Sequence, residues 1–237
     1  MCTIALAFRL LENTPVAIGA NREEHYDRPA APPAILESRP RVVAPRDLAA
    51  GGTWIAINEH GLLVAITNRP GGPTGERSRG LLVRDLADTR TVARAIARTR
   101  VELDRADYAG FTLLLADRHR AVTLQWDGAL TERELHPGIH VIVNEGIDDD
   151  VGKSSVVRAR LQAVAPSTVD EWRRRCATVL CDHGLGVCRH GEQAGTRSSS
   201  ILWCDTTGRI EWLYADGPPC RHQYRRVHAG PLSGSDS

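Results

Sequence analysis

The order in which apolar runs follow one another is the feature that most limits how this chain folds. Short apolar and β-branched runs come in pairs toward both ends of the chain, and helical periodicity lies between them. Paired strands joined by short turns form antiparallel sheets, whereas single strands that alternate with helices form parallel ones. The sequence therefore predicts an α+β fold with two antiparallel sheets and helices packed on them.

The predicted strands begin almost at the first residue. Turn sequences at Glu12–Thr14, Glu59–Gly61 and Thr207–Gly208 each separate two apolar runs. The predicted strands are Thr3–Phe8, Pro15–Ala20, Thr53–Asn58, Leu62–Thr67, Phe111–Ala116, Ala121–Trp126, Ile139–Asn144, Ser199–Asp205 and Arg209–Tyr214.

Helices are predicted in two regions. Apolar residues recur at helical spacing over Leu82–Leu103, which is long enough for two helices. Another helix is predicted over Ser155–Val164, and a further one from a cap at Ser167 or Thr168 through Cys181.

Length and composition favour one domain over residues 1–228, followed by a flexible tail at 229–237. The stretch Arg28–Arg46 is rich in Pro and Arg without periodicity, so it is predicted to be a long loop that covers a site. A formal net charge of +1 without a basic block argues against a nucleic-acid partner. The chain shows no signal peptide and no membrane-spanning run, which predicts a cytoplasmic protein with free thiols and no membrane partner.

Cys2 is the residue with the clearest chemical potential. A residue this small after Met1 is the usual condition for removal of the initiator, which leaves Cys2 with a free α-amino group. Such an amine has a pKa of about 7.7–8.0 and a thiol one of about 8.5, so the amine can take the proton of the thiol. The alternative is that Cys2 is a small apolar side chain at the start of a strand.

Charged residues follow the second predicted strand, beginning at Arg22. Because that strand pairs with the one that Cys2 begins, Arg22 is expected beside Cys2, with a guanidinium that favours thiolate. The alternative is a solvated charge cluster in a turn.

An ordered set of motifs resembles the NRDE family, also called the Transport and Golgi organisation 2 family. The motifs are Met1-Cys2, Asn21–Glu24, Gly51–Trp54, Asn58–Gly61, Thr67–Arg69, Ser78–Gly80 and Gly195–Ser199, with Glu23 in the place of the Asp in the family's name. That family resembles the N-terminal-nucleophile hydrolases of the choloylglycine hydrolase and penicillin V acylase group. The resemblance implies a four-layer αββα sandwich and cleavage of linear amides by the N-terminal Cys.

The resemblance also assigns roles to individual residues. It makes Cys2 the nucleophile, with Arg22 beside it and Asn68 stabilising the oxyanion, while Asn144 and Arg197 match a second Asn and a late Arg. The alternative for either Asn is a capping or turn residue at a strand end. The substrate-binding candidates are Glu24, His25 and Trp54, of which His25 stands where those hydrolases carry an Asp.

Two functions of different classes remain open at this point. The first is a cysteine amidase or acyl-transfer enzyme that acts on a small N-acyl compound and needs no cofactor. The second, which the family resemblance also implies, is a non-enzymatic protein that binds haem or an acylated metabolite, with Cys2, His25, His190 or Cys220 as ligands. The substrate and the oligomeric state are open in both.

One further group of residues has metal-ligand chemistry. It consists of Cys176, Cys181, His183, Cys188 and His190. The spacing lacks the close Cys pairs of a structural zinc site, so no metal is predicted. Cys176 and Cys181 are instead expected in or at the end of an amphipathic helix, as small apolar groups.

Overall fold

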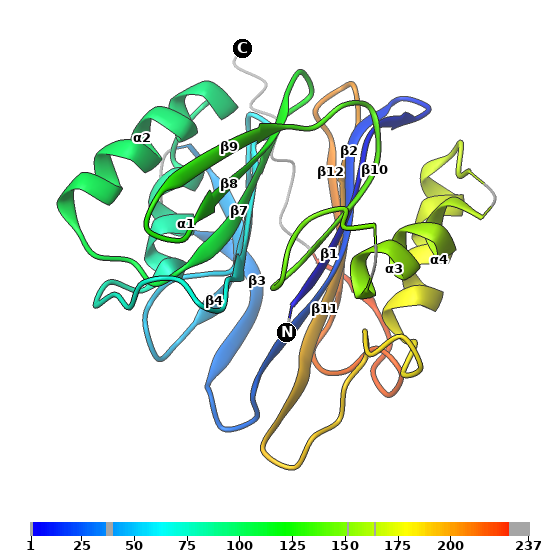
Figure 1. Ribbon diagram of the computed structural model, residues 1–237. Coiled ribbons are helices and arrows are strands. Elements are labelled where there is room, and N and C mark those ends of the chain that lie inside the picture. The colour runs from blue at the N-terminus through cyan, green and yellow to red at the C-terminus, as the bar shows by residue number, and fades with distance from the viewer. Residues whose placement is uncertain (1, 37–39, 151, 164, 228–237) are drawn as a thin grey trace. The chain divides into compact units, whose positions relative to one another are not determined.

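A computed structural model describes residues 2–36, 40–150, 152–163 and 165–227 (Figure 1). The chain divides into two compact units, and each unit holds one antiparallel sheet with two helices. Residues 1–28, 136–206 and 210–227 form the first unit, and residues 29–135 with 207–209 belong to the second. The predicted α+β class with two antiparallel sheets is therefore confirmed.

The sheet of the first unit has the strand order β10-β1-β2-β11-β12-β13. Its strands are β1 (Thr3–Leu11), β2 (Thr14–His25), β10 (Gly138–Val143), β11 (Ala194–Cys204), β12 (Ile210–Ala215) and β13 (Arg225–Arg226). The first strand is thus an interior one, and Thr3 lies opposite Asn21 on one side and Val143 on the other.

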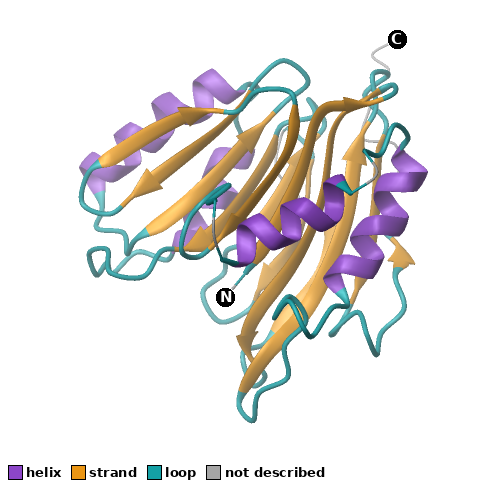
Figure 2. Cartoon of the chain, turned by 45° about the vertical axis from the view of Figure 1, so that its right-hand side comes forward, coloured by secondary structure: helices purple, strands orange, loops and turns teal. Residues whose placement is uncertain are grey.

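Helices α3 (Lys153–Gln162) and α4 (Val169–Leu180) pack on one face of this sheet, as Figure 2 shows. A capping box of Thr168 and Glu171 begins α4, in agreement with the predicted cap. Trp172 in α4 is fully buried. Gly19 of β2 allows the helix to approach closely, because a Cβ there would lie 2.6 Å from Cys176 Sγ.

The sheet of the second unit has the strand order β3-β4-β5-β6-β7-β8-β9. Its strands are β3 (Ala30–Leu36), β4 (Val42–Asp47), β5 (Ile55–Asn58), β6 (Leu63–Asn68), β7 (Phe111–Ala116), β8 (Ala121–Trp126) and β9 (Leu130–Glu134). Helices α1 (Arg79–Ala87) and α2 (Val92–Arg105) bury their apolar residues in the same core. Ser78 and Thr91 cap the two helices with their side-chain oxygens.

Several of the sequence motifs have a structural role in the second unit. A Cβ on Gly52 would clash with the backbone of Gly80, so these two glycines let the chain before β5 touch the start of α1. The Asn58 amide donates to the carbonyls of Ala87 and Thr89 at 2.9 and 2.6 Å, which joins β5 to the end of α1.

The prediction of a long loop at Arg28–Arg46 is wrong, because β3 and β4 occupy most of it. β3 is an edge strand, and its pairing with β4 shifts register between Ala31 and Ala34. Two prolines that lack an N–H are tolerated at such a position. β9, an edge strand of mostly exposed residues, was not predicted either.

The prediction that residues 1–228 form one domain stays a prediction, and the predicted tail, 229–237, lies outside the described residues. In the described part of the chain, no helix is long and apolar enough to cross a bilayer.

Candidate active site

The register of the first sheet places Cys2 between two of the predicted site residues. Thr3 pairs with Asn21 of β2 and with Val143 of β10, so the residue before it comes beside Arg22 and Asn144. The backbone N–H of Cys2 donates a hydrogen bond to Asn144 Oδ1 at 2.9 Å. After removal of Met1, this nitrogen is the α-amine.

The Cys2 side chain is half-buried, and its Sγ lies 4.0 Å from the carbonyl oxygen of Glu23. Burial raises the pKa of the thiol, and the negative charge of Glu23 raises it further. The Arg22 guanidinium lowers this pKa by less. The guanidinium thus favours the thiolate, as expected, but burial outweighs it and the pKa of the thiol lies above its ordinary value.

Arg22 is a buried residue of β2. The strand continues through His25, so the charged residues extend the strand and do not form the solvated turn of the alternative interpretation. Arg22 is 6% exposed, and its Nη2 lies 3.5 Å from Glu24 Oε2. Glu24 is the acidic partner that a buried guanidinium requires.

Arg197 lies inside β11, at the register shift between Thr196 and Ser198, and does not precede the strand as expected. Ser198 pairs with Arg22 across the two strands. Burial raises the pKa of Tyr214 in β12, while the charges of Arg22 and Arg197 lower it. Both guanidinium groups therefore act on the same region, and Arg197 Nε is buried without a hydrogen bond among the described residues.

Two partly buried groups of opposite charge, Glu23 and Lys153, were not predicted from the sequence. Burial raises the pKa of the Glu23 carboxyl, and the charge of Lys153 lowers it. Burial lowers the pKa of Lys153, against the charges of Glu23 and Glu145, and Cys2 acts on it as well. Lys153 is the only Lys in a chain otherwise rich in Arg, which was the one signal in the sequence.

Glu24 and His25 line a cavity of about 330 Å³ in the first unit. Its other walls come from Glu23, Arg189, His190, Gly191, Ala194 and Gly195. Two of the three expected substrate-binding residues therefore share a cavity with Glu23, the neighbour of the Cys2 sulfur.

The second unit holds the remaining two candidates. Asn68 is the exposed last residue of β6, where it pairs with Phe111 of β7. Trp54 precedes β5 and packs, partly buried, on the core of its own unit. The roles assigned to both residues stay predictions.

The fold defined by these sheets is that of the N-terminal-nucleophile hydrolases. Penicillin V acylase from Agrobacterium tumefaciens is similar with a TM-score of 0.62 at 14% identity, over 98% of this chain and 88% of that one. The N-acylethanolamine-hydrolyzing acid amidase ortholog of Caenorhabditis elegans has a TM-score of 0.58 at 14% identity, over 85% and 92%. A mutant of conjugated bile acid hydrolase from Clostridium perfringens has a TM-score of 0.57 at 10% identity, over 100% and 95%.

The chain belongs to the Transport and Golgi organisation 2 family, whose model matches residues 1–186. The Transport and Golgi organization protein 2 homolog of Bos taurus is 30% identical over 241 residues, which cover 86% of this chain and 85% of the relative. The family resemblance of the motifs is thus confirmed. The similarity to the solved structures shows the fold and nothing about activity.

Proposed function

We propose that this protein is an N-terminal-nucleophile cysteine hydrolase or acyl-transfer enzyme that acts on a linear amide bond of a small N-acyl compound. Cys2 is the nucleophile, and its own α-amine is the base. The observation that carries the proposal is the contact of the Cys2 nitrogen with Asn144 Oδ1 at 2.9 Å. This contact orients the atom that must accept the thiol proton.

The protonated state of the thiol makes that base necessary. Burial and Glu23 hold the pKa of the Cys2 thiol above its ordinary value, so little thiolate is present at neutral pH. An α-amine with a pKa of about 7.7–8.0 is partly neutral there and accepts the proton as sulfur attacks.

The proposed reaction balances with water as the only co-reactant. Sγ bonds to the amide carbonyl carbon while its proton moves to the α-amine, and the carbonyl oxygen becomes an oxyanion. The ammonium then protonates the leaving nitrogen as the C–N bond breaks, which leaves a thioester on Cys2. Water, deprotonated by the amine, attacks the thioester and releases the carboxylic acid and the thiol. With an amine in place of water, the same step is acyl transfer.

Arg197 is a further residue of the proposed site in the first unit. The family resemblance assigns the oxyanion to the Asn68 amide, and that role stays a prediction; such a donor contributes about 2.7–4 kcal/mol where one has been removed from an enzyme. Arg22 is already engaged by Glu24. Arg197, whose buried Nε makes no hydrogen bond among the described residues, is the better donor for a polar group of the substrate.

The substrate class rests on the solved structures with this fold. Their names describe a penicillin V acylase and an N-acylethanolamine-hydrolyzing amidase. The cavity that Glu23 lines is also lined by the polar residues Glu24, His25 and Arg189. Such a lining suits a polar part of an N-acyl compound.

The alternative, binding of haem or an acylated metabolite without catalysis, has less support. His190 Nε2 and Cys220 Sγ lie 3.1 Å apart, so no porphyrin fits between them as axial ligands on opposite faces. Cys2, His25, or either His190 or Cys220 alone remain as haem ligands in this alternative.

The test is hydrolysis of a panel of N-acyl amides by the wild type, Cys2→Ala and Cys204→Ala. Cys204 is a buried thiol of β11 and serves as the matched control. We expect turnover in the wild type and Cys204→Ala, and none in Cys2→Ala with an unchanged melting temperature. Turnover retained by Cys2→Ala would remove the thiol from the mechanism.

A further inference from the structure

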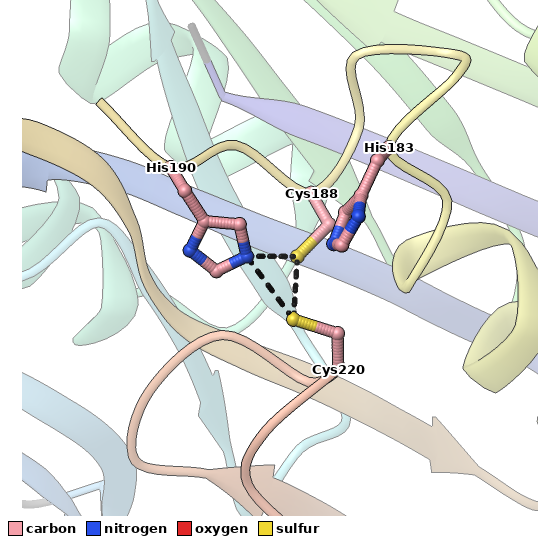
Figure 3. A group of neighbouring side chains, drawn as sticks. All are labelled: His183, Cys188, His190 and Cys220. Carbon is pink, nitrogen blue, oxygen red and sulfur yellow. Dashed lines mark hydrogen bonds between the residues drawn. The ribbon is translucent and has the colours of Figure 1, made fainter.

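Four potential metal ligands meet in the first unit, outside the residues around Cys2. Figure 3 shows the side chains of His183, Cys188, His190 and Cys220 pointing toward one another. One ligand atom of each lies within 4.8 Å of the other three. Three come from the segment between α4 and β11, and Cys220 comes from the turn after β12.

The distances between these atoms are those of ligands around one small ion. Cys188 Sγ lies 3.5 Å from Cys220 Sγ and 3.8 Å from His190 Nε2, and His190 Nε2 lies 3.1 Å from Cys220 Sγ. In a tetrahedron with Zn–S of about 2.3 Å and Zn–N of about 2.0–2.1 Å, ligand sulfurs are about 3.8 Å apart and sulfur and nitrogen about 3.6 Å apart. The His183 and His190 rings stand edge to face with centroids 5.1 Å apart. In Figure 3 one nitrogen of each ring lies on the side of the sulfurs.

We propose that His183, Cys188, His190 and Cys220 bind one Zn²⁺ ion as a structural site. Two thiolates with two imidazoles are a donor set typical of tetrahedral zinc. With all four positions filled by protein, no ligand position remains for a reacting water, so the ion stabilises the fold instead of joining the chemistry.

The backbone holds the ligands in place by hydrogen bonds of its own. After α4, the Asp182 carbonyl accepts from the N–H groups of Val187 and Cys188 at 3.2 and 3.0 Å, which turns the chain back beside His183. Asn21 of β2 donates to the Val187 carbonyl at 2.9 Å and fixes this turn on the sheet.

Cys220 is held by a turn of similar kind. The N–H groups of Arg221 and His222 donate to the Pro218 carbonyl at 2.9 and 3.0 Å. An ion between the two turns would join the segment before β11 to the segment after β12, which are not paired as strands in the described part of the chain.

The site also bears on the cavity near Cys2. His190 belongs to the metal group and to the cavity wall, and Arg189 beside it acts electrostatically on Glu23 and Lys153. Zinc would therefore fix one wall of the cavity, with Glu24 and His25 opposite on β2.

The four proposed ligands differ from the group of Cys and His residues that stand close together in the sequence. Cys176 is buried inside α4 and Cys181 is the residue that ends it, as expected for apolar thiols. Cys220 completes the set, and it lies 30 positions after His190, so ligand spacing along the chain did not reveal it.

The experiment measures metal content and thermal stability of the full chain, without reference to activity. We expect one zinc per chain by mass spectrometry of the metal, a lower melting temperature after chelation, and recovery on addition of Zn²⁺. Replacement of zinc by Co²⁺ is expected to give the visible absorption of a tetrahedral site with thiolate ligands.

Variants distinguish zinc bound by these four ligands from zinc bound elsewhere on the chain. Cys220→Ser and His183→Ala change exposed residues, so both are expected to fold and to lose the zinc. Cys204→Ser and His60→Ala are matched controls outside the cluster that are expected to retain it. Zinc retained by Cys220→Ser, bound iron or copper in place of zinc, or a Cys188–Cys220 disulfide in protein kept under reducing conditions would each overturn the proposal.

Discussion

Replacement of Asn144 changes the pH dependence of the proposed reaction in a direction that the structure fixes. Asn144 Oδ1 accepts a hydrogen bond from the Cys2 nitrogen at 2.9 Å, and this oxygen stabilises an ammonium more than a neutral amine. Hydrogen bonds to charged groups contribute about 1.5–3 kcal/mol and those between neutral groups about 0.5–1.5 kcal/mol, a difference of about 1 kcal/mol.

That difference converts to a shift in the amine pKa. Since one pKa unit corresponds to about 1.36 kcal/mol, Asn144→Ala is expected to lower the pKa of the α-amine by about 0.7 units. The base must be neutral to accept the thiol proton, so the acidic limb of kcat/KM against pH moves to lower pH by the same amount. The maximum value also falls, by about tenfold for about 1.4 kcal/mol of lost orientation.

Two further variants make the test specific. Asn144→Asp places a carboxylate beside the ammonium and is expected to move the acidic limb the other way, to higher pH. Asn21→Ala is the matched control, because the Asn21 amide donates to the carbonyls of Leu180 and Val187 and not to Cys2. It should lower stability without a shift of the limb. An unmoved limb in both Asn144 variants would refute the role of the α-amine as base.

Three further outcomes follow from the structure. Alkylation of Cys2 should accelerate only at a pH above the ordinary pKa of a thiol, because burial raises the pKa of this one. Glu23→Gln should shift the curve of labelling rate against pH to lower pH, and an unchanged curve would contradict the effect assigned to the Glu23 charge. Gly52→Ala should reduce the free energy of unfolding by about 1–3 kcal/mol in urea titrations, since its Cβ meets the backbone of α1, whereas Gly184→Ala should have little effect. Trp172→Ala should cost about 3–5 kcal/mol by the same titration, and a loss below about 1 kcal/mol would mean that α4 does not depend on this side chain.

The strands that could be predicted from the sequence are those with apolar and β-branched runs between turn residues. The pattern holds for β1, β2, β7 and β8. These strands are largely buried, so the apolar residues in their sequences indicate where the strands lie. β3 does not, because two prolines at an edge-strand register shift resemble a loop in composition. β9 carries mainly charged and exposed residues, for which burial gives no periodicity.

In the candidate site, too, some residues could be placed from the sequence and others could not. The places of Arg22 and Asn144 beside Cys2 follow from antiparallel pairing of neighbouring strands, so a sequence with correctly placed strands predicts them. The charge of Lys153 near Glu23 depends on how the start of α3 packs on the sheet. No local pattern encodes such packing. The raised pKa of the Cys2 thiol comes mainly from burial, which is likewise a property of the folded chain.

The most direct test of the central claim is the mass of the N-terminal peptide after the protein has been quenched during reaction with an N-acyl substrate. We predict a peptide that begins at Cys2 and carries the acyl group as a thioester on its sulfur. Acylation at another residue, or turnover by protein that retains Met1, would contradict the proposal that Cys2 acts through its own α-amine.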